Sequence, residues 1–255
     1  MPSVAPARTR GPLSLARALS KFGVCSRAEA ERWIAAGRVS VDGEVVLWPA
    51  RRIDPRRHKV KVDGRRVGDD TERLVLVLHK PAGYVTTRVE PGGRSTVYDL
   101  LGDVGRWVFP VGRLDRDSSG LLIFTNDHRL GQSLTDPDHA VPKTYHARVE
   151  GVPSEEALDL LRSGVTLGDG TQTRPAQVRS LGSVGEGSWL EIVLTEGKNR
   201  QVRRMCATVG HEVRDLVRVR VGGLDLGDLA PGKWRRLEPP DVARLSFPLP
   251  ERSAR

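Results

Sequence analysis

Short apolar runs, each broken off by Gly, Pro or Asp, are the dominant pattern of the chain from Leu74 onward. Runs of this length between turn-forming residues are typical of β-strands. They cover residues 74–79, 107–114, 121–125, 144–149 and 189–195. Helical stretches at 154–161 and 200–209 lie between them without a regular strand–helix–strand alternation. We therefore predict an α+β domain built on a largely antiparallel mixed sheet.

The first quarter of the chain has a different pattern, in which two helical stretches precede a hairpin. Apolar residues recur at helical spacing over 15–22, and Ser26 and Glu29 form the capping box that starts a second helix. The expected inward-facing residues of the second helix are Ala30, Trp33 and Ile34. The two helices stop at Gly23 and Gly37. Residues 39–47 follow as strand, tight turn and strand, which predicts a helix–helix–hairpin unit.

Glycines and charges interrupt the apolar pattern over residues 64–71, which is typical of a linker between domains. We predict a flexible basic tail over 1–12, a first domain over 13–66, a linker over 67–73, a second domain over 74–247 and a C-terminal tail over 248–255. The Arg-rich N-terminal tail would add nonspecific attraction for phosphate.

Positive charge is concentrated at two places along the chain. Lys and Arg number 41 against 32 Asp and Glu, which gives a net charge of +9. Residues 1–70 alone hold 15 Lys and Arg against 8 Asp and Glu, and a second concentration runs over 198–220. Because each cation placed on a phosphate releases a counterion, this pattern favours a long polyanionic partner. RNA, DNA and an anionic membrane surface are the candidates.

Several classes of protein lose support from what the sequence lacks. It has no run of about 18 apolar residues for a membrane helix and no apolar signal-peptide core, so we expect a cytoplasmic protein. Cys25 and Cys206 have no CxxC spacing and no clustered histidines, which favours two small buried side chains over a zinc site or a disulfide. Motifs for nucleotide hydrolysis, dinucleotide redox chemistry and zinc hydrolysis are also missing.

Residues 15–43 resemble an S4 domain, a small RNA-binding module shared by a ribosomal protein and several RNA-modifying enzymes. The resemblance implies binding of structured RNA through its shape and its phosphates. Arg17 and Lys21 lie one turn apart on the first predicted helix, and Arg27 and Arg38 flank the second. These four cations predict a shared RNA-binding face, whereas the simpler alternative is a solvated helix surface.

The segment over 111–127 is dense in groups that can do chemistry. A predicted strand ends near Gly112, an acidic and hydroxyl-rich loop follows, and a buried strand begins after Gly120. Asp115 would project from the sheet edge into a cleft, where a carboxylate can act as nucleophile or base if a cation keeps it ionised. From spacing alone, ordinary turn residues between two strands explain the same pattern.

Four segments are similar, in the same order, to the motifs of ribosomal RNA pseudouridine synthases of the RsuA/RluB type. They are KPAGYVTT at 80–87, GRLDRDSSGLL at 112–122, KTY at 143–145 and EGKNRQVRRM at 196–205. The resemblance implies an S4 domain followed by a pseudouridine synthase domain. It puts the essential aspartate at Asp115, the active-site tyrosine at Tyr145 and the arginine that pairs with the aspartate at Arg203.

The reaction implied by this resemblance detaches uracil from its ribose at N1 and reattaches it through C5. It involves no oxidation, no phosphoryl transfer and no group donor, so no cofactor and no metal are expected. The nucleotide must leave the helical stack before C1′ or C5 can react. Asp115 could attack C1′, add to the uracil ring or remove a proton from the sugar, and the sequence leaves these three steps open.

Two of the implied roles compete with simpler interpretations. By the resemblance the Tyr145 ring lies against the uracil, where stacking is worth about 1–3 kcal/mol, but a core aromatic side chain has the same pattern. Arg203 lies beside the buried stripe of its predicted helix, a position that also suits a surface or phosphate-binding arginine.

The remaining polar residues of the motifs have RNA-binding or structural assignments. Arg113 is expected to contact a phosphate or the flipped nucleotide near Asp115. Lys198 and Arg200 are expected to meet RNA phosphates at the start of a helix. Asp117 and Asp127 are interpreted as turn and capping residues.

Three functions remain open at this point. The first is site-specific isomerisation of uridine in ribosomal RNA, with large-subunit RNA as the expected substrate and a monomer as the expected state. The second is a non-catalytic ribosome-assembly protein that binds RNA through its S4 domain. The third, an S4-bearing RNA methyltransferase, has less support because a glycine-rich cofactor loop is missing.

Overall fold

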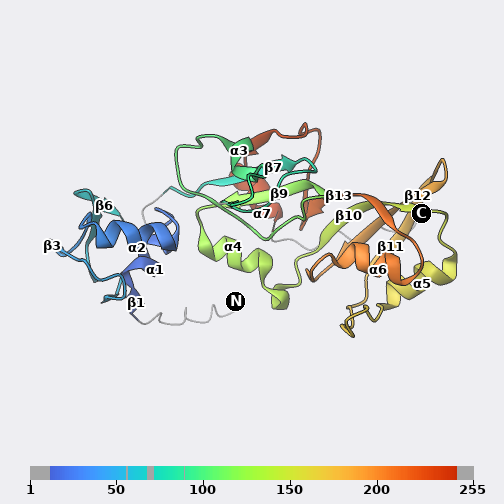
Figure 1. Cartoon of the computed structure of the whole chain (residues 1–255), viewed down its shortest axis with the longest axis horizontal. Coiled ribbons are helices and arrows are strands. Elements are labelled where there is room, and N and C mark those ends of the chain that lie inside the picture. The colour runs from blue at the N-terminus through green and yellow to red at the C-terminus, as the bar shows by residue number, and fades with distance from the viewer. Residues whose placement is uncertain (1–11, 56, 68–71, 89, 246–255) are drawn as a thin grey trace, which may run out of the picture. The chain divides into compact units, whose positions relative to one another are not determined.

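The computed structural model describes residues 12–55, 57–67, 72–88 and 90–245 (Figure 1). The chain packs as two compact units. The first unit holds the described residues up to Arg73 together with Gly105–Val108 and Asn126–His128, and the second unit holds the others. Most of the predicted tails and of the predicted linker, at 1–11, 68–71 and 246–255, lie outside the described residues.

Two helices and short strands build the first unit. Its helices are α1 (Leu15–Lys21) and α2 (Arg27–Ala35). Its strands are β1 (Leu13–Ser14), β2 (Val39–Val41), β3 (Glu44–Val45), β4 (Arg52–Ile53), β5 (Val60–Val62) and β6 (Arg65–Val67). An antiparallel sheet has the order β3-β2-β5-β6, and β1 pairs with β4. The predicted helix–helix–hairpin is confirmed, and β5 and β6 extend it.

The core of the first unit lies between its helices and its strands. The buried side chains of the helical part are Leu15, Ala18, Leu19, Phe22, Ala30 and Ile34. Trp33 is only half-buried, and the Arg38 guanidinium lies 4.7 Å from its ring centre. Cys25 is a small buried side chain as predicted, and burial raises the pKa of its thiol to about 12.

Two details of the first unit differ from the prediction. Ser26 caps α2 by accepting a hydrogen bond from the Glu29 amide at 3.1 Å, but the Glu29 carboxylate returns none, so only half of the predicted capping box forms. Val67 was assigned to the linker, yet it pairs with Val60 in β5. Arg65 and Arg66 are both exposed on this edge strand, which is why the segment resembles a polar loop in the sequence.

A nine-stranded sheet forms the centre of the second unit (Figure 1). Its order is β11-β12-β10-β13-β9-β7-β15, while β14 pairs with β13 and β8 pairs with β9. The strands are β7 (Val75–Lys80), β8 (Phe109–Pro110), β9 (Ser119–Thr125), β10 (Lys143–Glu150), β11 (Gln177–Val184), β12 (Gly187–Leu194), β13 (Val213–Val221), β14 (Leu224–Asp225) and β15 (Trp234–Arg236). Only the β13–β9 pair is parallel among these strands. The predicted α+β fold with a largely antiparallel mixed sheet is confirmed.

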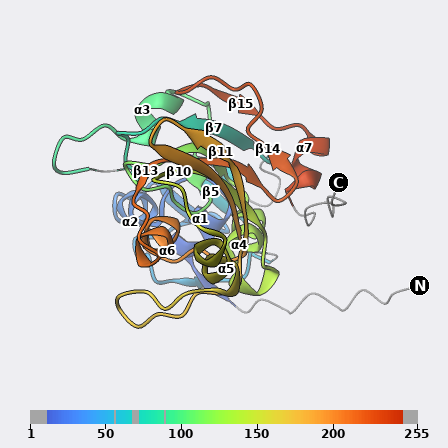
Figure 2. The same ribbon diagram turned by 90° about the vertical axis from the view of Figure 1, so that its right-hand side faces the viewer.

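Helices cover the sheet and enclose two apolar clusters. They are α3 (Val97–Leu101), α4 (His128–Thr135), α5 (Glu155–Ser163), α6 (Gln201–Thr208) and α7 (Pro239–Arg244). Figures 1 and 2 show α5 and α6 on one face of the sheet, where they bury Leu158, Leu161, Met205 and Cys206 against β10 and β12. None of the helices described is long and apolar enough to cross a membrane.

The seam between the two halves of the sheet positions the predicted reactive loop. Strand β13 pairs with β9 only at Val217 with Ser119 and at Arg218 with Gly120. Gly120 has φ +107°, and a Cβ there would lie 2.3 Å from the Arg218 carbonyl oxygen, so the close approach of the two strands requires glycine. The loop that carries Asp115 ends one residue before this seam.

Candidate active site

Hydrogen bonds to its backbone anchor the loop between β8 and β9 to the segment that follows β7. The Thr86 hydroxyl Oγ1 donates to the Leu114 carbonyl at 2.8 Å and accepts from the Leu114 amide at 3.3 Å. The Gly83 amide donates to the Arg116 carbonyl at 2.7 Å. Within the loop, the Ser118 amide donates to the Asp115 carbonyl at 3.1 Å and closes a turn. Asp115 is therefore the first residue of a turn in a loop whose backbone is held in place.

Lys80 supports the same loop from inside the protein. Its side chain is completely buried, and Nζ donates to the Ser118 carbonyl at 2.6 Å, the Pro81 carbonyl at 3.1 Å and the Arg116 carbonyl at 3.4 Å. Burial lowers the pKa of Lys80 to about 8, although the nearby charges of Asp117 and Asp115 act in the opposite direction. Lys80 lies in the KPAGYVTT motif, but no role was predicted for it, and the apolar run over 74–78 before it was the available signal.

A pocket of about 420 Å³ opens beside Asp115, a volume in the usual range for small-ligand sites. Its walls come from the reactive loop, from β10, from the segment that leads into α6 and from β13. Five of the predicted site residues line it, namely Arg113, Asp115, Tyr145, Lys198 and Arg200. Tyr145 also packs against the apolar cluster that contains Ala147 and Val149, so the residue borders both the core and the pocket, and its contact with uracil stays a prediction.

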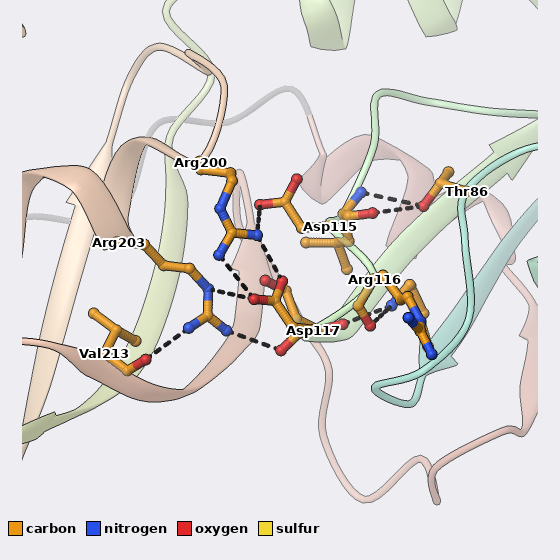
Figure 3. Close-up of polar contacts among 10 residues, drawn as sticks. Thr86, Asp115, Arg116, Asp117, Arg200, Arg203 and Val213 are labelled. Atoms are coloured by element: carbon orange, nitrogen blue, oxygen red, sulfur yellow. Dashed lines mark hydrogen bonds and ion pairs between the residues drawn. The ribbon is translucent and has the colours of Figure 1, made fainter.

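Arg203 does not pair with Asp115, which corrects the prediction (Figure 3). Its Nη2 donates to the Asp117 carbonyl at 2.9 Å, its Nη1 donates to the Val213 carbonyl at 2.7 Å, and its Nε lies 3.3 Å from Oδ2 of Asp117. Arg203 is nearly buried beside Val202 and Met205 on α6, as the helical pattern predicts, and from there it meets the loop two residues past Asp115.

Arg200 is the cation that lies near Asp115. Its Nη1 and Nη2 donate to Oδ1 and Oδ2 of Asp117 at 3.0 and 2.9 Å, and Nη1 lies 3.9 Å from Oδ2 of Asp115 (Figure 3). The hydrogen bonds from Arg200 lower the pKa of Asp117, and they raise the pKa of Arg200. Asp117 is therefore the partner of Arg200 and Arg203, although it was predicted only as a turn residue. Its position two residues from Asp115 was the missed signal.

Two further cations line the pocket without having been predicted. Arg218 on β13 is 5% exposed, and its Nε donates to the Leu121 carbonyl at 2.7 Å. Lys143 begins β10, and burial, together with the charge of Arg218, lowers its pKa to about 8. Lys143 lies in the KTY motif and Arg218 in the basic stretch over 198–220, but strand position alone does not reveal which side chains turn toward the pocket.

A buried carboxylate holds the start of α6. Glu196 accepts hydrogen bonds from the Arg174 amide at 2.9 Å and from Gln201 Nε2 at 2.6 Å, and its Oε2 lies 2.9 Å from Nζ of Lys198. Although burial opposes it, these contacts lower the pKa of Glu196. Lys198 is thus paired with an acid at the pocket edge. No group of three or more His, Cys, Asp or Glu side chains that could hold a metal occurs in the part of the chain that the structure describes.

Comparison with known proteins identifies the fold. Residues 74–208 match the family model of RNA pseudouridylate synthases, and residues 14–57 match the S4 domain. The chain is 40% identical over 228 residues to an uncharacterized RNA pseudouridine synthase of Aquifex aeolicus, covering 89% of this chain and 91% of the other. The chain belongs to the RNA pseudouridine synthase family.

Other relatives agree with this assignment. The ribosomal large subunit pseudouridine synthase B of Bacillus subtilis is 36% identical over 233 residues, which cover 91% of this chain and 94% of that protein. A crystal structure of a pseudouridylate synthase superposes with a TM-score of 0.65 at 25% identity, covering 91% of this chain and 99% of the other. As an RNA pseudouridine synthase, the chain is an enzyme with an N-terminal S4 domain.

The four cations predicted to bind RNA in the S4 domain of this pseudouridine synthase differ in their exposure and in their contacts with acids. Arg17 is exposed on α1, and Lys21 is half-buried one turn later. Arg27 lies 3.3 Å from Glu31, and Arg38 donates to both carboxylate oxygens of Asp63. Arg27 and Arg38 are therefore partly neutralised by acids of the same unit, and the predicted RNA contacts of all four remain predictions.

Proposed function

We propose that this enzyme converts one uridine of ribosomal RNA, in the large subunit, into pseudouridine, with Asp115 as the reacting carboxylate. The observation that supports this most strongly is the pocket in which Asp115, Tyr145 and five cations meet. A pocket of about 420 Å³ suits one nucleotide extruded from a helix better than a helix itself. The large-subunit assignment rests on the name of the Bacillus subtilis relative.

Asp115 has the environment that a reacting carboxylate needs. About a third of its side chain is exposed, on the pocket side, and the Arg200 guanidinium lies 3.9 Å from its Oδ2. Whether the carboxylate attacks C1′, adds to the ring or takes a proton from the sugar, it must approach the nucleotide with a free lone pair. The anchored loop holds it at the pocket mouth for this purpose.

The other pocket residues suit the binding of an extruded nucleotide. Tyr145 would stack on the uracil and offset part of the cost of taking it out of the helix. Arg113 would meet the phosphate or the flipped nucleotide, and Lys198 and Arg200 would meet neighbouring phosphates at the start of α6. The isomerisation reattaches the same uracil ring to the same ribose, with loss of the C5 proton and gain of one at N1, so the proposal includes no cofactor and no metal.

The S4 domain supplies the second part of the proposal. Its exposed Arg17 and neighbouring Lys21 would dock a structured RNA element, while the second unit modifies one uridine. We expect the enzyme to act in the cytoplasm, where ribosomal RNA is its substrate.

Release of tritium from ribosomal RNA labelled at uracil C5 tests this function, because a new bond at C5 replaces the C5–H bond. We expect release from large-subunit RNA by the wild type, no release by Asp115→Asn, and wild-type release by Asp225→Asn, a control carboxylate outside the pocket that pairs with Arg220. Release from small-subunit RNA alone would overturn the large-subunit assignment. Tight RNA binding without release by any of the proteins would favour the non-catalytic assembly protein instead.

A further inference from the structure

One guanidinium is shared unequally between two carboxylates at the reactive loop. Arg200 donates two hydrogen bonds to Asp117, at 3.0 and 2.9 Å, while its distance to Asp115 is 3.9 Å (Figure 3). A two-point contact is the strongest pairing that a guanidinium and a carboxylate can make, and 3.9 Å is beyond hydrogen-bond range. Asp117 therefore accepts the hydrogen bonds of Arg200, and Asp115 interacts with the Arg200 charge without a hydrogen bond.

The carboxylate oxygens of Asp115 consequently remain available. Among the described residues, no amide or side chain donates a hydrogen bond to them, and the Ser118 amide bonds only the Asp115 backbone. A carboxylate covered by a guanidinium at both oxygens would be ionised but a poor nucleophile or base. The observed spacing places a positive charge near Asp115 without covering its oxygens.

We propose that Asp117 is a positioning residue, which holds Arg200 in a two-point contact beside Asp115 and prevents it from binding the Asp115 carboxylate. This inference rests on the proposed function, because it takes Asp115 as the reacting group. If Asp117 lost its charge, the carboxylate nearest to the two guanidinium donors would be that of Asp115. The arginine would then cover the oxygens that must meet the nucleotide.

The backbone of Arg200 supports the assignment. Its φ of +47° and ψ of +35° are left-handed, a conformation that is costly for a residue with a side chain. Arg203 in the next turn binds the Asp117 carbonyl at 2.9 Å, so Asp117 is gripped through both its carboxylate and its backbone. Through these contacts, Asp117 fixes the position of the strained start of α6 relative to Asp115.

A double-mutant cycle separates positioning from a purely structural role. Tritium release is measured under single-turnover conditions for Asp117→Asn, Arg200→Gln and the combined variant. We expect Asp117→Asn to slow release about 100-fold when Arg200 is present and less than about 3-fold when Arg200 is replaced. The slower release requires the Arg200 guanidinium, which would otherwise cover Asp115. Equal losses in the two backgrounds would mean that Asp117 only shapes the loop, and would overturn the proposal.

Asp169→Asn is the matched control for this cycle. Asp169 pairs at 2.7 Å with Arg204, which lies on α6 like Arg203, and its side chain is about as exposed as that of Asp117. Neither Asp169 nor Arg204 lines the pocket. The pKa of Asp169 is also held well below the usual range by hydrogen bonds, first from Arg204. We expect this variant to release tritium at the wild-type rate.

A crystal structure of the Asp117→Asn protein gives a readout that does not depend on activity. We expect Arg200 to move from 3.9 Å to about 2.8 Å from the Asp115 oxygens, the usual length of a charged hydrogen bond. An Arg200 that stays away from Asp115 would overturn the inference, whatever the activity. Failure of the wild type to release tritium from any ribosomal RNA would count against the proposed function, and this structure would still decide the inference.

Discussion

A buried lysine beneath the reactive loop is the residue on which the loop conformation most depends. All three acceptors of the Lys80 ammonium are backbone carbonyls, and two of them, in Arg116 and Ser118, belong to the loop. Replacing Lys80 by Met leaves these carbonyls without a donor and lets the loop shift. We expect tritium release to fall about 10–100-fold, as small displacements of a reacting group do, with the exposed Lys233→Met unaffected. Wild-type release by Lys80→Met would contradict this role.

Lys80 also makes a defined contribution to the pH dependence of stability. Its pKa is about 8 in the folded protein against an ordinary value of 10.5, so between these values the unfolded chain binds more protons than the folded one. Stability from this group therefore rises as the pH rises from about 8 to 10.5. Denaturant unfolding of the wild type and of Lys80→Met should diverge over this window, in favour of the wild type. A constant difference between them would show that Lys80 titrates normally.

The loop illustrates which part of a site the sequence can predict. The motifs located Asp115, Tyr145 and the segment that leads into α6, and the structure brings these into one pocket. The pairing of Arg203 with Asp115 was wrong, because the turn closed by the Ser118 amide brings Asp117, not Asp115, against Arg203. Which of two nearby aspartates meets an arginine depends on the path of the loop backbone between them. Spacing along the sequence does not specify this path.

At the scale of elements, the contact between β9 and β13 is where the two halves of the sheet join. Gly120→Ala would force a Cβ to within 2.3 Å of the Arg218 carbonyl, in a backbone conformation that alanine disfavours. We expect a loss of at least about 3 kcal/mol in the free energy of unfolding. Gly168→Ala is the control, since a Cβ there meets nothing within 4 Å. Equal unfolding midpoints for the two variants would contradict the requirement for glycine at the seam.

Local patterns predicted some elements well and missed others for identifiable reasons. The predicted helices over 154–161 and 200–209 are found as α5 and α6, since each has a clear apolar stripe. Strand β13 was missed because its arginines alternate with valines over 217–221 and resemble a basic RNA-binding run. The predicted strand over 107–114 is wrong except at β8, because its apolar residues are buried by tertiary contacts rather than by sheet pairing. Tertiary packing, which no short window contains, decides such cases.

At the scale of the whole molecule, two basic regions are expected to bind one RNA, so affinity should depend steeply on salt. Replacing Arg17 and Lys21 together by Ala should reduce the slope of log affinity against log salt by about 1–2, the value expected for two lost phosphate contacts. Arg179→Ala, which removes an exposed arginine already paired with Glu191, is the control. An unchanged slope for the double variant would remove α1 from the RNA-binding surface.

We propose that the Asp115 carboxylate performs the chemistry and that the pocket binds RNA whether or not this carboxylate is present. The most direct test measures RNA affinity and single-turnover tritium release on the same large-subunit RNA for the wild type and for Asp115→Asn. We predict affinities within about threefold of each other and a release rate lowered by at least about 1,000-fold. Release by Asp115→Asn at a rate near that of the wild type would contradict the claim.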